Sequence, residues 1–471
     1  MENSKKLLKN SPSARRADKL AKQVQSSQPD AKLTHALVSK LHSFLTQHLS
    51  PQPKLLLALS GGLDSCVLLH LLAEVKHIFL FELQAMHVHH GLSPNADAWT
   101  ALCAKTCESL HVPLQVVYVN VDPSSKQGIE AAARELRYQA LFNYKFGEVF
   151  PDYVVTAHHQ DDQAETLLLQ LLRGAGVKGL SSMAALDETR RLLRPLLDVS
   201  RHALNAYAVQ HQIEWCEDES NDNTQYERNF VRHNVMPVLE THFPSAKSVI
   251  ARTASHLAEA NGLLDTLATL DARELLLNNS LCLQGLSQLD IPRAKNVLRW
   301  WFAQNQLAMP NAEHLTETLQ QLLNARADAD LSIQLQHLTL KRYQKRAYLY
   351  VDKIAEPFDL AWNGEPTLTL PDGGQLHFKQ VSGTGLALKF GMTKLRITNR
   401  DGGERFKPNS LRPTRTLKHL LQEANIPPWQ RAHLPLIYWQ DTLAYVPGIG
   451  VASGLPAGFN EIGLEIIWQD S

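Results

Sequence analysis

The sequence is poor in cysteine and has no membrane-length hydrophobic run, and both absences narrow what the protein can be. Only 5 of its 471 residues are cysteine, and no two of them form a Cys-x-x-Cys pair. A disulfide framework, a zinc site and an iron–sulfur centre are therefore not expected. No apolar run approaches the roughly 20 residues that cross a membrane, and the first residues lack the apolar core of a signal peptide. We expect a cytoplasmic protein with no membrane partner.

The chain also lacks a net charge, because 47 Lys and Arg residues balance 47 Asp and Glu residues. This balance would argue against a nucleic-acid partner if the charges were evenly distributed. Between residues 386 and 420, however, nine basic residues stand against two acidic ones, Asp401 and Glu404. This segment is a candidate phosphate-binding surface, although a solvated basic face would have the same composition. The basic residues are Lys389, Lys394, Arg396, Arg400, Arg405, Lys407, Arg412, Arg415 and Lys418.

The length predicts several domains, since 471 residues exceed a single ordinary core. Residues 1–32 are polar and basic and are interpreted as a disordered tail. Strands and helices alternate over 33–243, which predicts the catalytic domain, and 244–351 are largely helical. Residues 352–385 hold Pro and Gly in a β-like context and are expected to form a linker or a small β segment. Residues 386–471 are typical of a small, basic α+β domain.

The alternating region predicts a doubly wound α/β domain with a parallel sheet. We expect strands at 55–59, 83–89, 115–121 and 153–157, with helices at 65–74, 95–110, 129–144 and 162–173. Ligands of such sheets bind at the carboxyl ends of the strands. The polar segments that follow these strands are therefore the places to look for a site.

The turn after the first expected strand reads Ser-Gly-Gly-Leu-Asp-Ser and leads directly into a helix. Free backbone N–H groups at a helix start favour an anion, and glycines let a phosphate approach the backbone. The carboxylate of Asp64 would repel a phosphate unless a cation lay between them, so we predict Mg²⁺ at Asp64. The alternative is a plain strand-to-helix connection with a capping serine. The expected nucleotide-binding residues are Ser60, Gly61, Gly62, Leu63, Asp64 and Ser65.

Histidines, carboxylates and arginines follow the other expected strands. The pattern after the fourth strand, His158-His159-Gln160-Asp161-Asp162 with Glu165 one turn on, places several polar groups around one pocket. The aspartates could instead be helix caps. Two arginines, Arg134 and Arg137, share one helix face; they could neutralise a phosphate or contact RNA, or be solvated. The paired arginines of a later loop, Arg228 and Arg232, could be either site residues or surface residues. The histidines at 87, 89 and 90 are not expected to bind a metal.

Together these segments resemble one family, the tRNA(Ile)-lysidine synthetases of the PP-loop, or N-type ATP pyrophosphatase, superfamily. The resemblance covers nearly the whole folded chain in the right order. It rests on SGGLDS at 60, HVHHGLSPNADAW at 87, GIEAAARELRY at 128, AHHQDDQAETLLLQLLRGAGVKGL at 157, the DxSN…RNxxR pattern over 218–232, GGERF at 402 and PPWQRAHLPLIY at 427. The basic N-terminal extension and Glu219, where the family more often has proline, depart from the pattern.

The resemblance implies a two-step reaction. ATP would adenylate C2 of the wobble cytidine in a tRNA(Ile) with a CAU anticodon, and the amine of L-lysine would then displace AMP to give lysidine. The roles would be pyrophosphate binding at the SGGLDS turn, Mg²⁺ at Asp64, and stabilisation of the intermediate by Arg137 or Arg134. Lysine would be bound or deprotonated by Asp162, with Asp161, Glu165 or His159 nearby. The helical and basic C-terminal domains would hold the tRNA, and a homodimer is possible.

Three rival interpretations stay open at this point. A PP-loop enzyme that thiolates a tRNA base would share the adenylation step, but it generally needs reactive cysteines or a cluster. A non-catalytic RNA-binding protein with a vestigial nucleotide fold would not need an intact Ser-Gly-Gly-x-Asp-Ser turn. A synthetase acting on small molecules would leave the basic C-terminal segment without a purpose.

Overall fold

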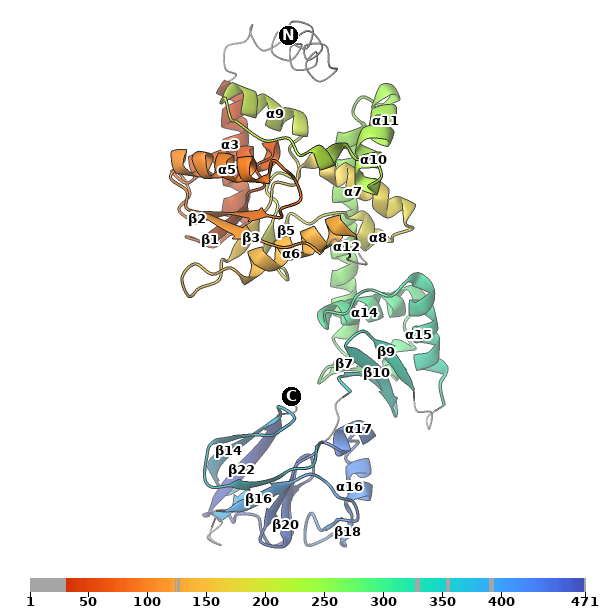
Figure 1. Cartoon of the computed structure of the whole chain (residues 1–471). Coiled ribbons are helices and arrows are strands. Elements are labelled where there is room, and N and C mark those ends of the chain that lie inside the picture. The colour runs from red at the N-terminus through yellow and green to blue at the C-terminus, as the bar shows by residue number, and fades with distance from the viewer. Residues whose placement is uncertain are drawn as a thin grey trace, which may run out of the picture. The chain divides into compact units, whose positions relative to one another are not determined.

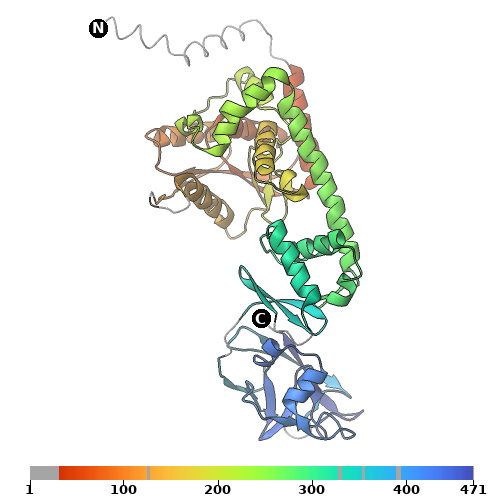
Figure 2. The same ribbon diagram turned by 90° about the vertical axis from the view of Figure 1, so that its right-hand side faces the viewer.

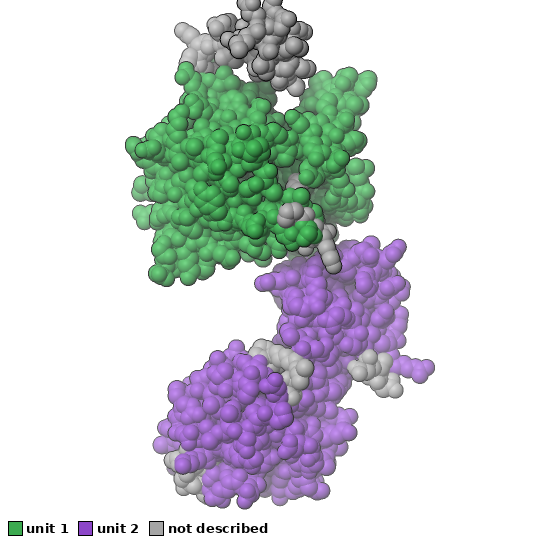
Figure 3. All heavy atoms as spheres, viewed as in Figure 1, with its two compact units in different colours: residues 1–265 green, residues 266–471 purple. Residues whose placement is uncertain are grey.

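The computed structural model describes residues 31–122, 124, 128–326, 331–352, 356–388 and 394–469 (Figure 1). Almost all of the expected tail over 1–32 lies outside these described residues, as does Lys389. The chain divides into two compact units, Met1–Asp265 and Thr266–Ser471, coloured separately in Figure 3. No described helix is long and apolar enough to cross a membrane.

The first unit is built on a six-stranded sheet with the strand order β3-β2-β1-β4-β6-β5. Every neighbouring pair is parallel except β5 with β6. The central strand is buried on both faces, as its Leu55-Leu56-Leu57 run predicts. The strands are β1 (Lys54–Ala58), β2 (Glu82–His89), β3 (Leu114–Tyr118), β4 (Tyr153–Val155), β5 (Leu186–Asp187) and β6 (Leu192–Leu193).

Helices cover both faces of this sheet, so the expected doubly wound fold is confirmed. Leu55 and Leu57 pack into one core with α3 (Ala31–His48), α4 (Leu63–Val75), α5 (Ala96–Ser109) and α9 (Arg201–Gln210). Leu56 faces the other way and packs with Leu141 of α6 (Ile129–Asn143). The alternation of side chains along β1 therefore supplies both cores.

The remaining helices of this unit carry the polar groups of the later motifs. A short π-helical turn, η3, lies between α10 and α11, and such turns occur often at functional sites. Figure 2 shows the 27-residue α12 in green. The elements are α7 (Gln160–Leu172), α8 (Val177–Leu180), the 3₁₀ turn η2 (Glu219–Asp222), α10 (Glu227–Phe230), η3 (Val231–Val235), α11 (Met236–His242) and α12 (Ala246–Ala272).

The second unit begins with helices packed on a five-stranded antiparallel sheet of order β7-β8-β11-β10-β9. Trp301 and Phe302 are the largest fully buried side chains of this core. The helices expected over 244–351 are present, and the same segment also contains this sheet, which the description as largely helical did not include. The elements are β7 (Leu276–Leu277), β8 (Ser280–Cys282), α13 (Leu283–Leu286), α14 (Ile291–Gln304), α15 (Ala312–Asn324), β9 (Ser332–Leu335), β10 (Leu338–Tyr343) and β11 (Arg346–Tyr350).

The rest of the second unit consists mainly of two antiparallel sheets. Their orders are β12-β16-β19-β20-β21 and β13-β14-β22-β15, and β17 pairs with β18 in a separate ribbon. The segment 352–385 contributes β12 (Asp359–Trp362), β13 (Thr367–Thr369) and β14 (Gln375–Ser382). The other elements are β15 (Leu386–Ala387), β16 (Leu395–Thr398), β17 (Arg405–Phe406), β18 (Arg415–Thr416), α16 (Leu417–Glu423), α17 (Pro428–Arg431), β19 (Leu436–Trp439), β20 (Thr442–Val446), β21 (Gly450–Val451) and β22 (Ile462–Gln469).

Candidate functional site

The Ser-Gly-Gly-Leu-Asp-Ser turn connects β1 to α4 and is closed by its own two serines. The hydroxyl oxygens of Ser60 and Ser65 lie 3.0 Å apart, and Ser65 Oγ donates to the carbonyl of Gly62 at 3.0 Å. Gly61 has a φ of +84°, and a Cβ there would lie 3.2 Å from Cys103 Sγ. Gly62 has an ordinary φ of −76°. Glycine is therefore required by the backbone at Gly61, whereas at Gly62 it leaves the helix start open to a ligand.

Asp64 lies in the first turn of α4 with one carboxylate oxygen unsatisfied. Its Oδ2 lies 3.5 Å from Nε2 of His159, and its buried Oδ1 has no hydrogen-bond partner among the residues that the structure describes. An orphaned carboxylate oxygen at a helix N-terminus fits a bound cation, which would supply the missing partner. Among the described residues no group of three or more His, Cys, Asp and Glu side chains could hold a metal. A cation here would thus depend on Asp64 together with ligand oxygens.

His159 is buried and bridges two carboxylates. Its Nε2 lies 3.4 Å from Oδ2 of Asp162, close to the distance from Asp64, and its backbone N–H donates to the same Asp162 oxygen at 2.9 Å. Burial works against the charged imidazolium, but the carboxylates of Asp162 and Asp64 outweigh it and raise the pKa of His159. The side chain therefore couples the turn after β1 to the first turn of α7.

Two carboxylates of α7 form a buried network with two arginines. Oδ1 of Asp162 accepts from Arg228 at 2.8 Å and from Arg232 at 3.0 Å. Glu165 accepts from Arg228 Nε at 3.0 Å and from Arg232 Nε at 2.6 Å. Burial opposes ionisation of Asp162, but His159 and Arg228 lower its pKa to about 2. Asp162 is therefore held ionised, and the arginines fix the positions of both carboxylates.

The arginines of this network were not among the predicted site residues. Arg228 lies in α10 and Arg232 in the π-helical turn that follows, so the two guanidinium groups lie one turn apart. The sequence signal was the spacing of four in Arg-Asn-x-x-Arg, which puts both side chains on one helix face. Nothing local in the sequence says which carboxylates lie opposite them.

Asp161 is directed away from Asp162 and serves other partners. Its Oδ1 accepts from the backbone N–H of Arg201 at 3.1 Å, at the start of α9. Its Oδ2 pairs with Lys247 in the first turn of α12 at 3.0 Å, and Lys247 also contacts Glu240 at 3.3 Å. Asp161 thus ties α7 to two other helices, whereas Asp162 and Glu165 share the arginines. The three predicted carboxylates do not converge on one point.

On the face covered by α6, the carboxyl end of the sheet carries cationic side chains instead of acidic ones. Nε and Nη2 of Arg137 both lie 3.3 Å from Nε2 of His90, and the Arg134 guanidinium lies 5.1 Å from the centre of the Tyr138 ring. Burial and the Arg137 charge lower the pKa of His90 to about 4, and burial lowers the pKa of His158 to about 4. The two histidines are therefore neutral near pH 7, and the arginines carry the charge on this side.

The other histidines of the second motif have structural partners. Nδ1 of His87 lies 2.9 Å from the carbonyl oxygen of Leu59, just before the Ser-Gly-Gly turn. Nε2 of His89 lies 3.1 Å from Oδ1 of Asp97. His87 therefore supports the position of the turn between β1 and α4.

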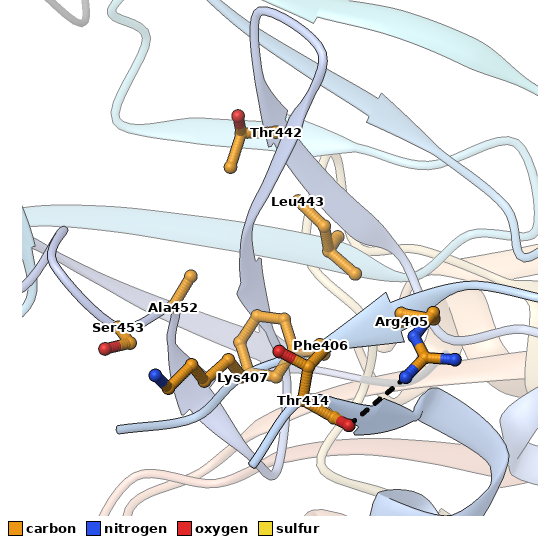
Figure 4. A pocket seen from close by; sticks show the side chains of 8 residues that line it. All are labelled: Arg405, Phe406, Lys407, Thr414, Thr442, Leu443, Ala452 and Ser453. Carbon is orange, nitrogen blue, oxygen red and sulfur yellow. Dashed lines mark hydrogen bonds between the residues drawn. The ribbon is translucent and has the colours of Figure 1, made fainter. Parts of the chain in front are cut away.

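The basic C-terminal segment is partly neutralised within its own domain. Four of its arginines form ion pairs: Arg396 with Asp359, Arg400 with Glu404, and Arg412 and Arg415 with Glu423. A pocket of about 350 Å³ lies beside the β17–β18 ribbon, and Figure 4 shows the cationic Arg405 and Lys407 beside apolar side chains. Its lining residues are Arg405, Phe406, Lys407, Thr414, Thr442, Leu443, Ala452 and Ser453.

A Ser-Gly-Gly-x-Asp-Ser turn at the carboxyl end of a central parallel strand, facing buried carboxylates, defines a PP-loop nucleotide-binding protein. Residues 33–239 match the family model of the PP-loop domain, as expected from this geometry. Residues 281–348 match the TilS substrate binding domain, and residues 395–468 match the TilS substrate C-terminal domain. The chain belongs to the tRNA(Ile)-lysidine synthase family, which confirms the resemblance inferred from the sequence.

Relatives with curated names are similar over almost their whole length. The chain is 40% identical over 436 residues to the tRNA(Ile)-lysidine synthase of Nitrosomonas europaea, covering 91% of this chain and 94% of the relative. It is 40% identical over 426 residues to that of Aromatoleum aromaticum, covering 89% and 98%. It is 37% identical over 433 residues to that of Coxiella burnetii, covering 91% and 95%.

Proposed function

We propose that this protein is an ATP-dependent ligase that makes lysidine at the wobble cytidine of tRNA(Ile) with a CAU anticodon. In the first step the oxygen on C2 of that cytidine accepts AMP from ATP, and pyrophosphate leaves. In the second step the amine of L-lysine forms the C–N bond and AMP leaves. The observation that carries the proposal is the proximity of Asp64 in the PP-loop turn to His159, which also lies beside Asp162, in a chain whose relatives are named for this reaction.

The nucleotide is assigned to the turn between β1 and α4. Ser60, Gly61, Gly62 and Ser65 would bind the pyrophosphate part of ATP through hydroxyl and backbone donors, next to Leu63 at the helix start. Asp64 would hold Mg²⁺, and its buried, unpartnered Oδ1 supports this role. When bound, Mg²⁺ supplies charge neutralisation for the leaving pyrophosphate.

The lysine is assigned to the acidic side of the site. Asp162 and Glu165 would attract its ammonium group, and Arg228 or Arg232 would pair with its carboxylate. Because the pKa of Asp162 is held near 2, this carboxylate acts as an anionic binder and is a weak base. Proton removal from the lysine amine would then fall to Glu165 or His159. Asp161 would be a positioning residue, because its two carboxylate oxygens already contact Lys247 and the backbone N–H at the start of α9.

The tRNA is assigned to the basic side of the site and to the second unit. Arg137, with Arg134, would stabilise the adenylated cytidine, and the target base must be splayed out of the anticodon loop to reach it. The two TilS-type domains of the second unit would hold the tRNA body in the cytoplasm. The possible homodimer stays a prediction, which sedimentation equilibrium would test.

The test is incorporation of labelled lysine into RNA. The purified full-length protein is incubated with ATP, MgCl₂, labelled L-lysine and a transcript of tRNA(Ile) with a CAU anticodon. We expect ATP-dependent label in the RNA, and none when the wobble cytidine is replaced by uridine. Release of pyrophosphate without label in the RNA would contradict the choice of lysine as nucleophile, and would return the thiolating PP-loop enzymes as the alternative.

A further inference from the structure

Arg194 is a buried cation that none of the motifs pointed to. It follows β6 directly and is 7% exposed. Its Nη1 donates to the carbonyl of Ala184 at 2.7 Å, but its Nε is buried and has no hydrogen-bond partner. Within the part of the chain that the structure describes, it forms no ion pair, although buried guanidinium groups are almost always paired with an anion.

The charged side chains near Arg194 do not neutralise its guanidinium as an ion-pair partner would. Burial opposes the charged guanidinium, and so do the charges of Arg190 and Arg134, whereas Tyr138 and Asp187 act in its favour. The contrast with Arg232 is direct: that guanidinium is also largely buried but contacts Asp162 and Glu165. An arginine does not lose its proton at physiological pH, so Arg194 stays charged and lacks a counterion.

Arg194 places this unpaired charge at the carboxyl end of the sheet, where the proposed catalytic site lies. The backbone N–H of Thr156 donates to the carbonyl of Leu193 at 2.9 Å, so Arg194 lies beside the end of β4, where the His158-His159 pair begins. Leu192 packs in the α6 core and Leu193 in the opposite core. Continued alternation therefore places Arg194 on the α6 side, with Arg134.

We propose that Arg194 is a phosphate-binding residue of the catalytic site, whose missing counterion is a phosphate group of a substrate. This inference rests on the proposed function and adds a third arginine to Arg134 and Arg137 on the cationic side. The phosphate would come either from the nucleotide, as the group transferred as AMP, or from the RNA backbone next to the target cytidine. The guanidinium matches a phosphate because it offers parallel N–H donors in a fixed plane.

The experiment compares Arg194→Met with Arg190→Met in the full-length protein. Methionine keeps an unbranched, apolar side chain and removes the charge. Arg190 is an exposed arginine in the turn between β5 and β6, four residues before Arg194, which makes it a matched control. Binding of ATP in MgCl₂ without tRNA and binding of the tRNA transcript without ATP are measured separately. We expect Arg194→Met to weaken one of the two about tenfold or more, with Arg190→Met within about twofold of wild type.

The thermal midpoint without ligand separates binding from structure. We expect Arg194→Met to keep or raise it, because a buried unpaired charge is removed and Ala184, whose carbonyl loses a donor, is an exposed residue. Arg194→Lys keeps the charge without the planar fork and should recover part of the lost affinity, which also covers the case in which the methionine variant does not fold. Loss in the ATP arm identifies the nucleotide phosphate, and loss in the tRNA arm identifies the RNA phosphate.

The inference is overturned if the two Arg194 variants bind both ligands like wild type, whether or not they are less stable. A rise only in the KM for lysine would likewise overturn it, because the counterion would then be a carboxylate. Failure of the proposed function gives a different result: the wild-type protein would bind ATP in an Arg194-dependent way but transfer no lysine to tRNA(Ile).

Discussion

The two units differ in whether their charged side chains are buried and in how these side chains are paired. In the first unit the site carboxylates are buried, with Asp162 7% and Glu165 2% exposed, and each is held by two guanidinium groups. In the second unit the arginines and lysines of the basic segment lie mostly at the surface, and several pair with carboxylates of their own domain. Buried pairs are poorly screened and fix geometry, whereas exposed cations act through a summed field that salt weakens.

This contrast sets the order of expected effects. Removing one buried charge of the site in the first unit should lower activity or stability steeply, because the charges around it are then less well balanced. Removing one charge in the second unit should change RNA affinity modestly and in proportion to the number removed.

The largest effect is expected for Asp64→Asn. The amide cannot supply the negative charge that a Mg²⁺ ion needs, so lysidine formation should fall by at least about a hundredfold. Binding of tRNA, measured without ATP, should change little. Asp97→Asn is the matched control, since Asp97 is a carboxylate of α5 whose side chain is 94% exposed. Full turnover by the Asp64→Asn protein would refute the metal role.

Glu165→Gln tests the buried network by stability. It removes one of the two carboxylates that pair with Arg228 and Arg232, so Asp162 alone faces both guanidinium groups. We expect a loss of about 3 kcal/mol in the free energy of unfolding. The control is Glu227→Gln, because Glu227 pairs with Arg173 at the surface, where a loss of at most about 1 kcal/mol is expected. Urea unfolding of both variants measures the difference. Equal losses would show that burial is not what separates the two pairs.

The pH dependence of stability should carry the signature of Asp162. Its pKa is about 2 in the folded protein and about 3.9 in an unfolded chain, so the unfolded state binds more protons between these values. The stabilisation by Asp162 is therefore complete above about pH 4 and is lost as the pH falls toward 2. Asp162→Asn should flatten the fall in unfolding free energy over this interval, measured by urea unfolding at several pH values. An unchanged slope would contradict the ionised, paired Asp162.

The smallest effect is expected for the double variant Arg405→Gln, Lys407→Gln beside the C-terminal pocket. If both cations contact phosphates, tRNA affinity should fall a few-fold at low salt and the slope of log K against log salt should decrease by about 1 to 2. Arg396→Gln is the control, because Arg396 is paired with Asp359 within its domain. Filter binding over a salt series gives both slopes. Equal slopes for wild type and double variant would remove this pocket from the RNA surface.

Much of the catalytic unit followed from local sequence. The buried Leu run, the Ser-Gly-Gly turn and the helix after it were expected at 55–59 and 65–74 and are found as β1 at Lys54–Ala58 and α4 at Leu63–Val75. The earlier start of α4 matters, because it places Asp64 in the first helical turn. Helix α6 was expected at 129–144 and runs over Ile129–Asn143. These elements depend on neighbouring residues, so periodicity and turn chemistry suffice to predict them.

The roles of the site residues were decided by tertiary structure. Asp161 and Asp162 are adjacent in sequence but contact different helices, because successive side chains of a helix point about 100° apart. Arg228 and Arg232 are more than 60 residues from Glu165 in sequence, and only the fold brings them together.

The amino-acid sequence by itself determined the doubly wound sheet, the PP-loop turn and the family, because each can be predicted from motifs of residues that lie close together along the chain. Only the tertiary structure decided which carboxylates contact which arginines. It also decided that Arg194 is buried at the carboxyl end of the sheet without a counterion among the described residues. Ion pairing depends on distances between segments that sequence order leaves open, and burial depends on what packs above a side chain.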